Sequence, residues 1–265
     1  MSLTLTARRW RVTAVIGAAE YFSDGWLAVL GYGMRLVKVL VLLAIMRTVF
    51  AGQASVSGMS LSGVLTYVLI AEALADQLEV RTQIIRYFWE GSIVVKYLQP
   101  MSLVGQLVSE MLGQWLPPLM LFSLPLVLLA PVFGVSAAPA SWAALPVLGL
   151  SLVLGIALGV ALDFIFGACT VMLGESVWLI SVVRTAIEGL LSGAIIPLAL
   201  LPGVLPSVLG WLPFASVAST PMRIYTGTGG IWPLVPLQAG WLLSMSALAL
   251  WLWRKARERM VGMGG

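Results

Sequence analysis

The sequence contains no histidine and only one cysteine, Cys169. Without histidine, the chain has no imidazole for general acid–base catalysis or for binding a metal ion. A single cysteine cannot form a disulfide within the chain, and Cys169 lies in an apolar run where a small buried side chain is the usual role. These absences exclude histidine-dependent enzymes and scaffolds held together by internal disulfides.

Charged residues are also scarce, because they make up only 10% of the 265 residues while 60% are hydrophobic. The mean hydropathy is +1.01. Soluble domains are about 25% charged, so this composition excludes an ordinary soluble domain as well as a disordered chain. Because a membrane-crossing helix needs about 20 apolar residues, the length allows about six spans. The composition therefore predicts a polytopic membrane protein.

The motifs of common nucleotide-binding and hydrolytic enzymes are absent as well. The sequence has no GxxxxGK[ST] phosphate loop, no GxSxG elbow, no HExxH helix and no CxxC pair. We therefore expect no nucleotide site, no metal site and no cofactor on this chain, and no enzymatic activity of its own. A channel, or a permease driven by another component, is favoured.

The hydrophobic runs predict an all-α membrane protein with one transmembrane domain over residues 1–265. We expect six spans, at residues 26–50, 61–79, 104–133, 142–168, 177–201 and 232–253. Residues 4–24 carry Arg8, Arg9 and Arg11, and an apolar run follows that meets Glu20 instead of a cleavage site. This pattern predicts an uncleaved amphipathic helix in the membrane interface. Residues 202–231 are apolar but rich in proline and glycine, which predicts short re-entrant helices between spans five and six.

The distribution of basic residues predicts the orientation. With the N-terminus inside, ten basic residues fall in inside segments, and only Arg223 and the border residue Arg47 fall outside. The ten are Arg8, Arg9, Arg11, Arg81, Arg86, Lys96, Arg254, Lys255, Arg257 and Arg259. Both termini are therefore expected in the cytoplasm, in a chain that spans the inner or plasma membrane. The net charge of +4 is explained by topology, so membrane lipids are expected partners and nucleic acid is not.

Several ionisable residues fall within the expected spans, where one charge at the bilayer centre costs about 2.5–3.5 kcal/mol on insertion scales. They are Arg35, Lys38, Glu72, Asp76, Asp163, Arg184 and Glu188. In one interpretation they neutralise one another, the first two with the next two, and Arg184 with Asp163 or Glu188. In the other, some of them line a water-filled inner cavity and contact a substrate.

Three local features resemble a known family. The stretch Glu90-Gly91-Ser92-Ile93, followed by Tyr97-Leu98-Gln99-Pro100, is similar to a Gly-x-Leu/Ile and Leu-x-Pro segment that contacts an ATPase. The proline-rich run from Ser192 to Pro221 is similar to a fifth span followed by outer re-entrant helices. The basic tail from Arg254 ends in Gly264-Gly265. In these features the chain resembles the membrane subunit of a type-2 ATP-binding-cassette (ABC) exporter, of the small six-span bacterial permeases.

The resemblance implies a permease that moves a substrate out of the cytoplasm by alternating access. ATP and Mg²⁺ would belong to a separate ABC ATPase, and a second permease chain, identical or paralogous, would complete the membrane domain. The implied ATPase-coupling residues, within the cytoplasmic segment 80–103, are Trp89, Glu90, Gly91, Ile93, Tyr97, Leu98 and Pro100. The implied outer gate comprises Pro197, Pro202, Pro213 and Phe214.

The chain departs from the family pattern just before Gly91. Related permeases tend to have Asp-Ile-Arg there, whereas this sequence has Tyr87-Phe88-Trp89. The difference indicates an aromatic docking surface, or a partner permease that supplies the charged version. Anchoring of these aromatics in the membrane interface is the alternative. A non-transporting assembly or scaffold protein and a secondary transporter remain the alternative functions.

Overall fold

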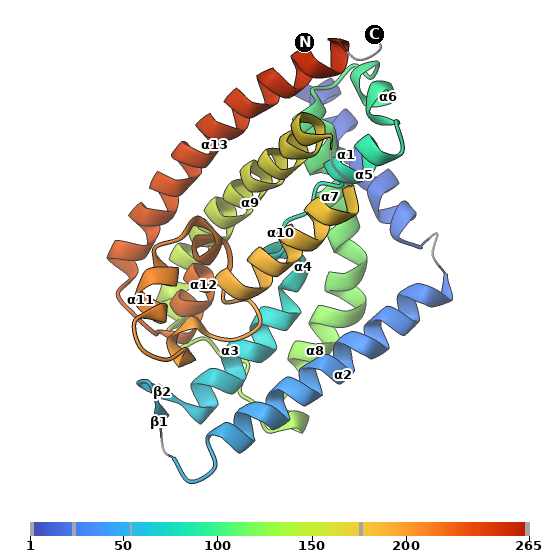
Figure 1. Cartoon of the computed structure of the whole chain (residues 1–265). Helices are drawn as coiled ribbons and strands as arrows, with labels where there is room; N and C mark the ends of the chain where they lie inside the picture. The colour runs from blue at the N-terminus through green and yellow to red at the C-terminus, as the bar shows by residue number, and fades with distance from the viewer. Residues whose placement is uncertain (1–2, 23–24, 54, 175–176, 263–265) are drawn as a thin grey trace.

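The computed structural model describes residues 3–22, 25–53, 55–174 and 177–262, and nearly all their secondary structure is helical (Figure 1). The α-helices are α1 (Leu3–Tyr21), α2 (Trp26–Val49), α3 (Leu61–Ala73), α4 (Ala75–Leu78), α5 (Ile84–Trp89), α6 (Ile93–Tyr97), α7 (Leu103–Pro118), α8 (Leu124–Leu128), α9 (Leu145–Leu173), α10 (Val177–Leu191), α11 (Leu205–Gly210), α12 (Pro213–Thr226) and α13 (Ile231–Gly262). A hairpin pairs β1 (Ser55–Val56) antiparallel with β2 (Met59–Ser60). Within the expected tail, residues 263–265 lie outside the described residues.

Four helical segments of the described chain are long and apolar enough to cross a membrane. They are Trp26–Val49, Leu103–Leu128, Trp142–Leu173 and Trp232–Arg259. The all-α membrane fold is therefore confirmed, whereas six full-length spans are not shown. The expected second span is shorter, since α3 has 13 residues and rises only about 20 Å at 1.5 Å per residue. The expected fifth span contains the 15-residue α10, which ends at Leu191.

Local backbone geometry explains why these two helices stop early. Leu74 leaves the helical region at φ −102° and ψ 16°, and the short helix α4 restarts after it. Beyond α10, Gly193 adopts φ +73°, which a residue with a side chain rarely takes, and the chain turns toward Pro197.

Proline shapes two other regions of the fold. Helix α7 ends at Pro117 and Pro118, and the next turn, Leu119–Ser123, is π-helical before Pro125 opens α8. A proline lacks the N–H of the α-helical ladder, so the helix changes its hydrogen-bond register there. In the expected re-entrant segment, the chain forms the short helices α11 and α12 in place of one straight span, and α12 packs against α9 and α13.

Helix α9 lies at the centre of the bundle and approaches its neighbours closely through glycines. A Cβ added at Gly159 would lie 2.6 Å from the side chain of Val80, and one at Gly155 would lie 3.0 Å from the carbonyl oxygen of Val217. Gly155 and Gly159, four positions apart on α9, thus allow close packing within the chain. Val80 begins the segment that carries α5 and α6, so this segment is held directly against the central helix.

Helix α1 packs along α7 and contacts its backbone. A Cβ at Gly113 would lie 1.9 Å from the carbonyl oxygen of Ala14, and a Cβ at Gly17 would lie 2.3 Å from that of Glu110. The helix expected in the membrane interface thus has one face covered by protein. The start of α1, the end of α13, α5 and α6 lie at one end of the molecule, and the β1–β2 hairpin lies at the other (Figure 1).

Candidate functional site

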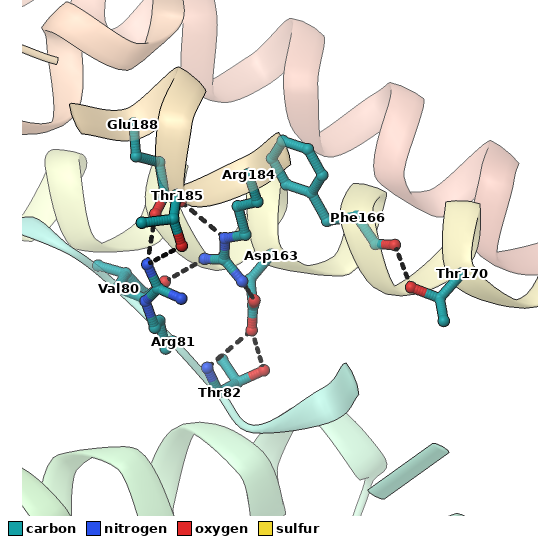
Figure 2. Close-up of polar contacts among 9 residues, drawn as sticks. All are labelled: Val80, Arg81, Thr82, Asp163, Phe166, Thr170, Arg184, Thr185 and Glu188. Atoms are coloured by element: carbon teal, nitrogen blue, oxygen red, sulfur yellow. Dashed lines mark hydrogen bonds and ion pairs between the residues drawn. The ribbon is translucent and has the colours of Figure 1, made fainter. Parts of the chain in front are cut away.

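Arg184 of α10 is the centre of a buried ionic cluster (Figure 2). Its Nη1 contacts Oδ1 of Asp163 on α9, and its Nε lies 2.7 Å from Oε1 of Glu188, one turn further along α10. Its Nη2 donates a hydrogen bond of 2.6 Å to the carbonyl oxygen of Val80. The side chains of Arg184 and Asp163 are only 3% and 1% exposed. Removing either side chain would leave the cluster with one excess buried charge, and an uncompensated buried charge typically costs about 3–5 kcal/mol.

The same cluster holds the beginning of segment 80–103. Oδ2 of Asp163 accepts a 2.7 Å hydrogen bond from the backbone N–H of Thr82 and a second bond from the Thr82 hydroxyl. Nη2 of Arg81 lies 3.1 Å from Oε2 of Glu188 and 3.3 Å from the hydroxyl of Thr185 (Figure 2). Two cations and two anions therefore neutralise one another and bind this segment to α9 and α10.

A second group of ion pairs joins α2 to α3 and α4. Nη1 of Arg35 lies 3.0 Å from Oδ2 of Asp76, and Nζ of Lys38 lies 2.6 Å from Oε1 of Glu72. Arg35 also donates to the backbone carbonyl of Glu72 at 3.2 Å and stacks over the ring of Phe122. The structure thus brings together the charges that the sequence placed on the first two spans.

A third set of polar contacts ties α5 and α6 to α1 and α7. Nζ of Lys96 contacts the Glu110 carboxylate, and the hydroxyl of Tyr87 donates to the same carboxylate at 2.9 Å. Nη2 of Arg86 lies 2.8 Å from Oε1 of Glu20. Burial, and then the Glu110 charge, raises the pKa of Tyr87. Burial lowers the pKa of Arg86, but the hydrogen bond and charge of Glu20 outweigh it and raise the pKa overall.

Sequence reasoning missed the roles of these residues. Glu110 reads as an interfacial residue at the start of a span, yet the structure buries it against Lys96 and Tyr87. Glu20 reads only as the end of an apolar run, but it pairs with Arg86, which is 66 positions away in the sequence. The available signal was the presence of carboxylates in an otherwise apolar chain, since each of them needs a partner.

The residues expected to contact an ATPase separate into a packed and an exposed set. Ile93 is only 6% exposed and packs in a core cluster with Ile84 and Leu103. By contrast, Trp89 and Leu98 are 72% and 80% exposed. The exposed set also includes Glu90, Gly91, Tyr97 and Pro100. Gly91 adopts φ +69° and lets the chain turn from α5 into α6.

Two cavities flank segment 80–103 and share Arg81 and Gln83 in their walls. The larger, about 490 Å³, lies beside the buried cluster, and its lining includes Arg81, Arg86, Asp163, Arg184, Trp89 and Trp178. The smaller, about 370 Å³, is lined in part by Arg35, Lys38, Glu72, Asp76 and Glu79. Most of the charges that pair with one another therefore also line a cavity.

The residues expected at an outer gate belong to the proline-rich region. Pro197 precedes a 3₁₀ turn (Leu198–Leu200), and Pro202 follows it. Pro213 opens α12, and the neighbouring Phe214 packs on a cluster that contains Leu158 of α9. Among the described residues, no group of three or more histidine, cysteine, aspartate or glutamate side chains could hold a metal ion.

Comparison with known proteins agrees with this architecture. The family model described as "ABC-2 family transporter protein" matches residues 36–264, from α2 to the C-terminal end. None of the curated proteins matches the chain. Members of this family are membrane permeases without an ATPase domain, and ABC permeases generally work with ATPase subunits. Because the match covers most of the chain, this multi-pass membrane protein belongs to the ABC-2 family of transporter permeases.

Proposed function

We propose that this chain is one half of the membrane domain of an ABC exporter and that it moves a substrate out of the cytoplasm by alternating access. A separate ATPase would hydrolyse ATP and dock at the end of the molecule that carries α5 and α6. A second permease chain, identical or paralogous, would complete the membrane domain. The observation that carries this proposal is the exposed apolar surface of α6 and its flanks.

This surface, named here the coupling surface, consists of Trp89, Val94, Val95, Tyr97 and Leu98. All five side chains are exposed, although apolar side chains gathered on a short element at a membrane-protein end usually have a partner. The opposite side of the segment packs within the chain through Ile84, Ile85 and Ile93. The segment therefore has one face that packs within the chain and one face that is exposed, as expected of an element that enters a cleft of another protein.

Ion pairs and hydrogen bonds connect the segment that carries the coupling surface to helices that line the cavities. The segment is fixed at its start to α9 and α10 through Thr82 and Arg81, and near its end to α7 through Lys96. A displacement of the coupling surface would thus shift the helices around both cavities. Rigid elements joined by ion pairs are a suitable physical basis for such coupling.

The proposed orientation places the coupling surface and both termini in the cytoplasm. The C-terminal end of α13 lies at the same end of the molecule as α6 (Figure 1). Arg254, Lys255 and Arg257 of α13 are exposed. Basic residues next to membrane spans are retained on the cytoplasmic side. An ATPase would therefore meet the coupling surface from the compartment that supplies ATP.

The test is a charge at Leu98. We expect Leu98→Asp to leave the permease folded in the membrane but to abolish co-purification of the ATPase, because a carboxylate would be desolvated in the docking cleft. Leu98→Met is the matched control, since it keeps an apolar side chain of similar volume. Ile93 is unsuitable for this test, because a charge at this buried position would disturb the fold itself.

Two results would contradict the proposal. One is full ATPase association and coupled ATP hydrolysis by the Leu98→Asp complex, which would place the docking surface elsewhere. The other is ATP hydrolysis by the purified chain alone, since a permease of this family lacks an ATPase domain. A protein that is only a scaffold would bind its partners without ATP-dependent movement of any solute across reconstituted vesicles.

A further inference from the structure

Glu79 follows α4 and faces the cavity of about 370 Å³ between α2, α4 and α7. It is half-buried. This volume lies within the range of about 300–1,000 Å³ that is usual for small-molecule sites. A carboxylate at such a place is of interest because every neighbouring charge has a partner.

The ion pairs of the described chain match six acidic residues with six basic residues in this part of the molecule. They join Glu20 to Arg86, Glu72 to Lys38, Asp76 to Arg35, Glu110 to Lys96, Asp163 to Arg184, and Glu188 to Arg81. Within the described residues, the Glu79 carboxylate forms no ion pair and accepts no hydrogen bond. The cavity is therefore left with one unmatched negative charge.

The cations that share this cavity with Glu79 already pair with other carboxylates. Arg81 lines the same cavity, but its guanidinium binds Glu188 at 3.1 Å and Thr185 at 3.3 Å. Lys38 binds Glu72 at 2.6 Å. Recruiting Lys38 to Glu79 would release Glu72. Recruiting Arg81 would leave Arg184 as the one cation for both Asp163 and Glu188, so the excess negative charge would only move to that cluster.

The remaining walls of the cavity also suit a cation with an apolar body. Tyr21 and Trp115 contribute aromatic rings, and Gln83 and Gln114 contribute amide groups. The Tyr21 ring is held in a stack with Tyr32, at 6.3 Å between centroids. Aromatic faces attract cations because the ring quadrupole is negative above and below its plane. An anion, in contrast, would meet the unmatched carboxylate of Glu79.

We propose that this cavity binds a monovalent amphiphilic cation and that Glu79 is its counter-ion. The inference rests on the proposed function, for which it names the substrate class. The apolar body of the ligand would lie against Tyr21 and Trp115, and its positive charge would neutralise the Glu79 carboxylate.

The experiment compares two probes of nearly the same shape and opposite charge, tetraphenylphosphonium and tetraphenylborate. Binding to the purified complex is measured by equilibrium dialysis in a non-ionic detergent without nucleotide. We expect tetraphenylphosphonium to bind more tightly, and Glu79→Gln to weaken its binding by about tenfold, since an ion pair in a partly desolvated site exceeds a neutral contact by roughly that factor. Glu79→Asp should keep most of the affinity, and Glu258→Gln, at an exposed site on α13, should change nothing.

Two outcomes would overturn the inference. Equal affinity for the two probes would show that the cavity does not select charge. Unchanged binding of tetraphenylphosphonium to Glu79→Gln, with a normal gel-filtration profile, would exclude Glu79 as the counter-ion. Dialysis needs no ATP hydrolysis, so either result is distinct from a failure of the proposed function. That failure would appear as a wild-type permease that does not associate with an ATPase.

Discussion

Replacing the buried pair of Asp163 and Arg184 tests whether its members stabilise the fold only as a pair. The proposed perturbations are Asp163→Leu, Arg184→Met and the double substitution. Both side chains are almost fully buried. Arg184→Met leaves the Asp163 carboxylate without its cation, and Asp163→Leu leaves Arg184 and Arg81 with Glu188 as their one shared anion, so either single substitution leaves one excess charge in the cluster. Such a loss typically costs about 3–5 kcal/mol. At about 2–4 °C per kcal/mol for a chain of this size, Tm should fall by about 6–20 °C.

The double variant should recover much of this loss. It removes both charges and places apolar side chains at both positions, a change that is often neutral for a buried pair. Recovery will be incomplete because the Thr82 N–H, which donates to Asp163 at 2.7 Å, would lose its acceptor. An unsatisfied buried N–H costs about 1–3 kcal/mol. Glu188 would keep Arg81 as its partner at 3.1 Å.

The assay is thermal unfolding of the detergent-purified protein, followed by gel filtration after heating, together with the amount of protein in the membrane. A double variant that is more stable than both single variants supports the pairing. A double variant whose Tm falls by the sum of the two single losses would refute it. In that case each side chain would act through separate contacts, such as those of Arg184 to the Val80 carbonyl oxygen.

Two further predictions concern other contacts of the bundle. Glu72→Leu should reduce the level of folded protein in the membrane more than Glu72→Leu combined with Lys38→Met, because the Lys38 ammonium, 2.6 Å from Glu72, would otherwise lose its partner; equal or lower levels of the combined variant would contradict this. Gly113→Ala should lower stability by about 1–3 kcal/mol or more, since its Cβ would lie 1.9 Å from the carbonyl oxygen of Ala14. Gly149→Ala is the matched control, because a Cβ there meets nothing within 4 Å, and a Tm of Gly113→Ala equal to that of this control would show that α1 does not pack on α7 as described.

Local sequence patterns predicted several elements well because their causes are local. The first span was expected at residues 26–50, and α2 occupies Trp26–Val49. The prolines of residues 202–231 predicted short helices, and α11 and α12 are present there. A missing N–H acts on its own helix, whatever surrounds it. Family membership likewise followed from short motifs and is confirmed.

Span length was predicted less well because it depends on the surroundings of a helix. The apolar run at residues 61–79 predicts one span, but the structure ends α3 at Ala73. In this bundle nearly every residue of α3 is buried by protein, so lipid does not dictate its length. Similarly, α13 continues to Gly262, well beyond the expected end at residue 253, because a charged helix can extend into water.

The sequence by itself determined that this protein is an all-α membrane permease, because composition and hydropathy require a membrane and the motifs identify the family. Only the tertiary structure decided which charges meet. Lys96 and Glu110 are 14 positions apart, and Arg81 and Glu188 are 107 apart, so no local pattern joins them. The unmatched carboxylate of Glu79 became visible only after every neighbouring charge had been assigned a partner. The physical reason is that an ion pair depends on the distance between two side chains in the folded structure, whereas hydropathy can be read from the order of the residues.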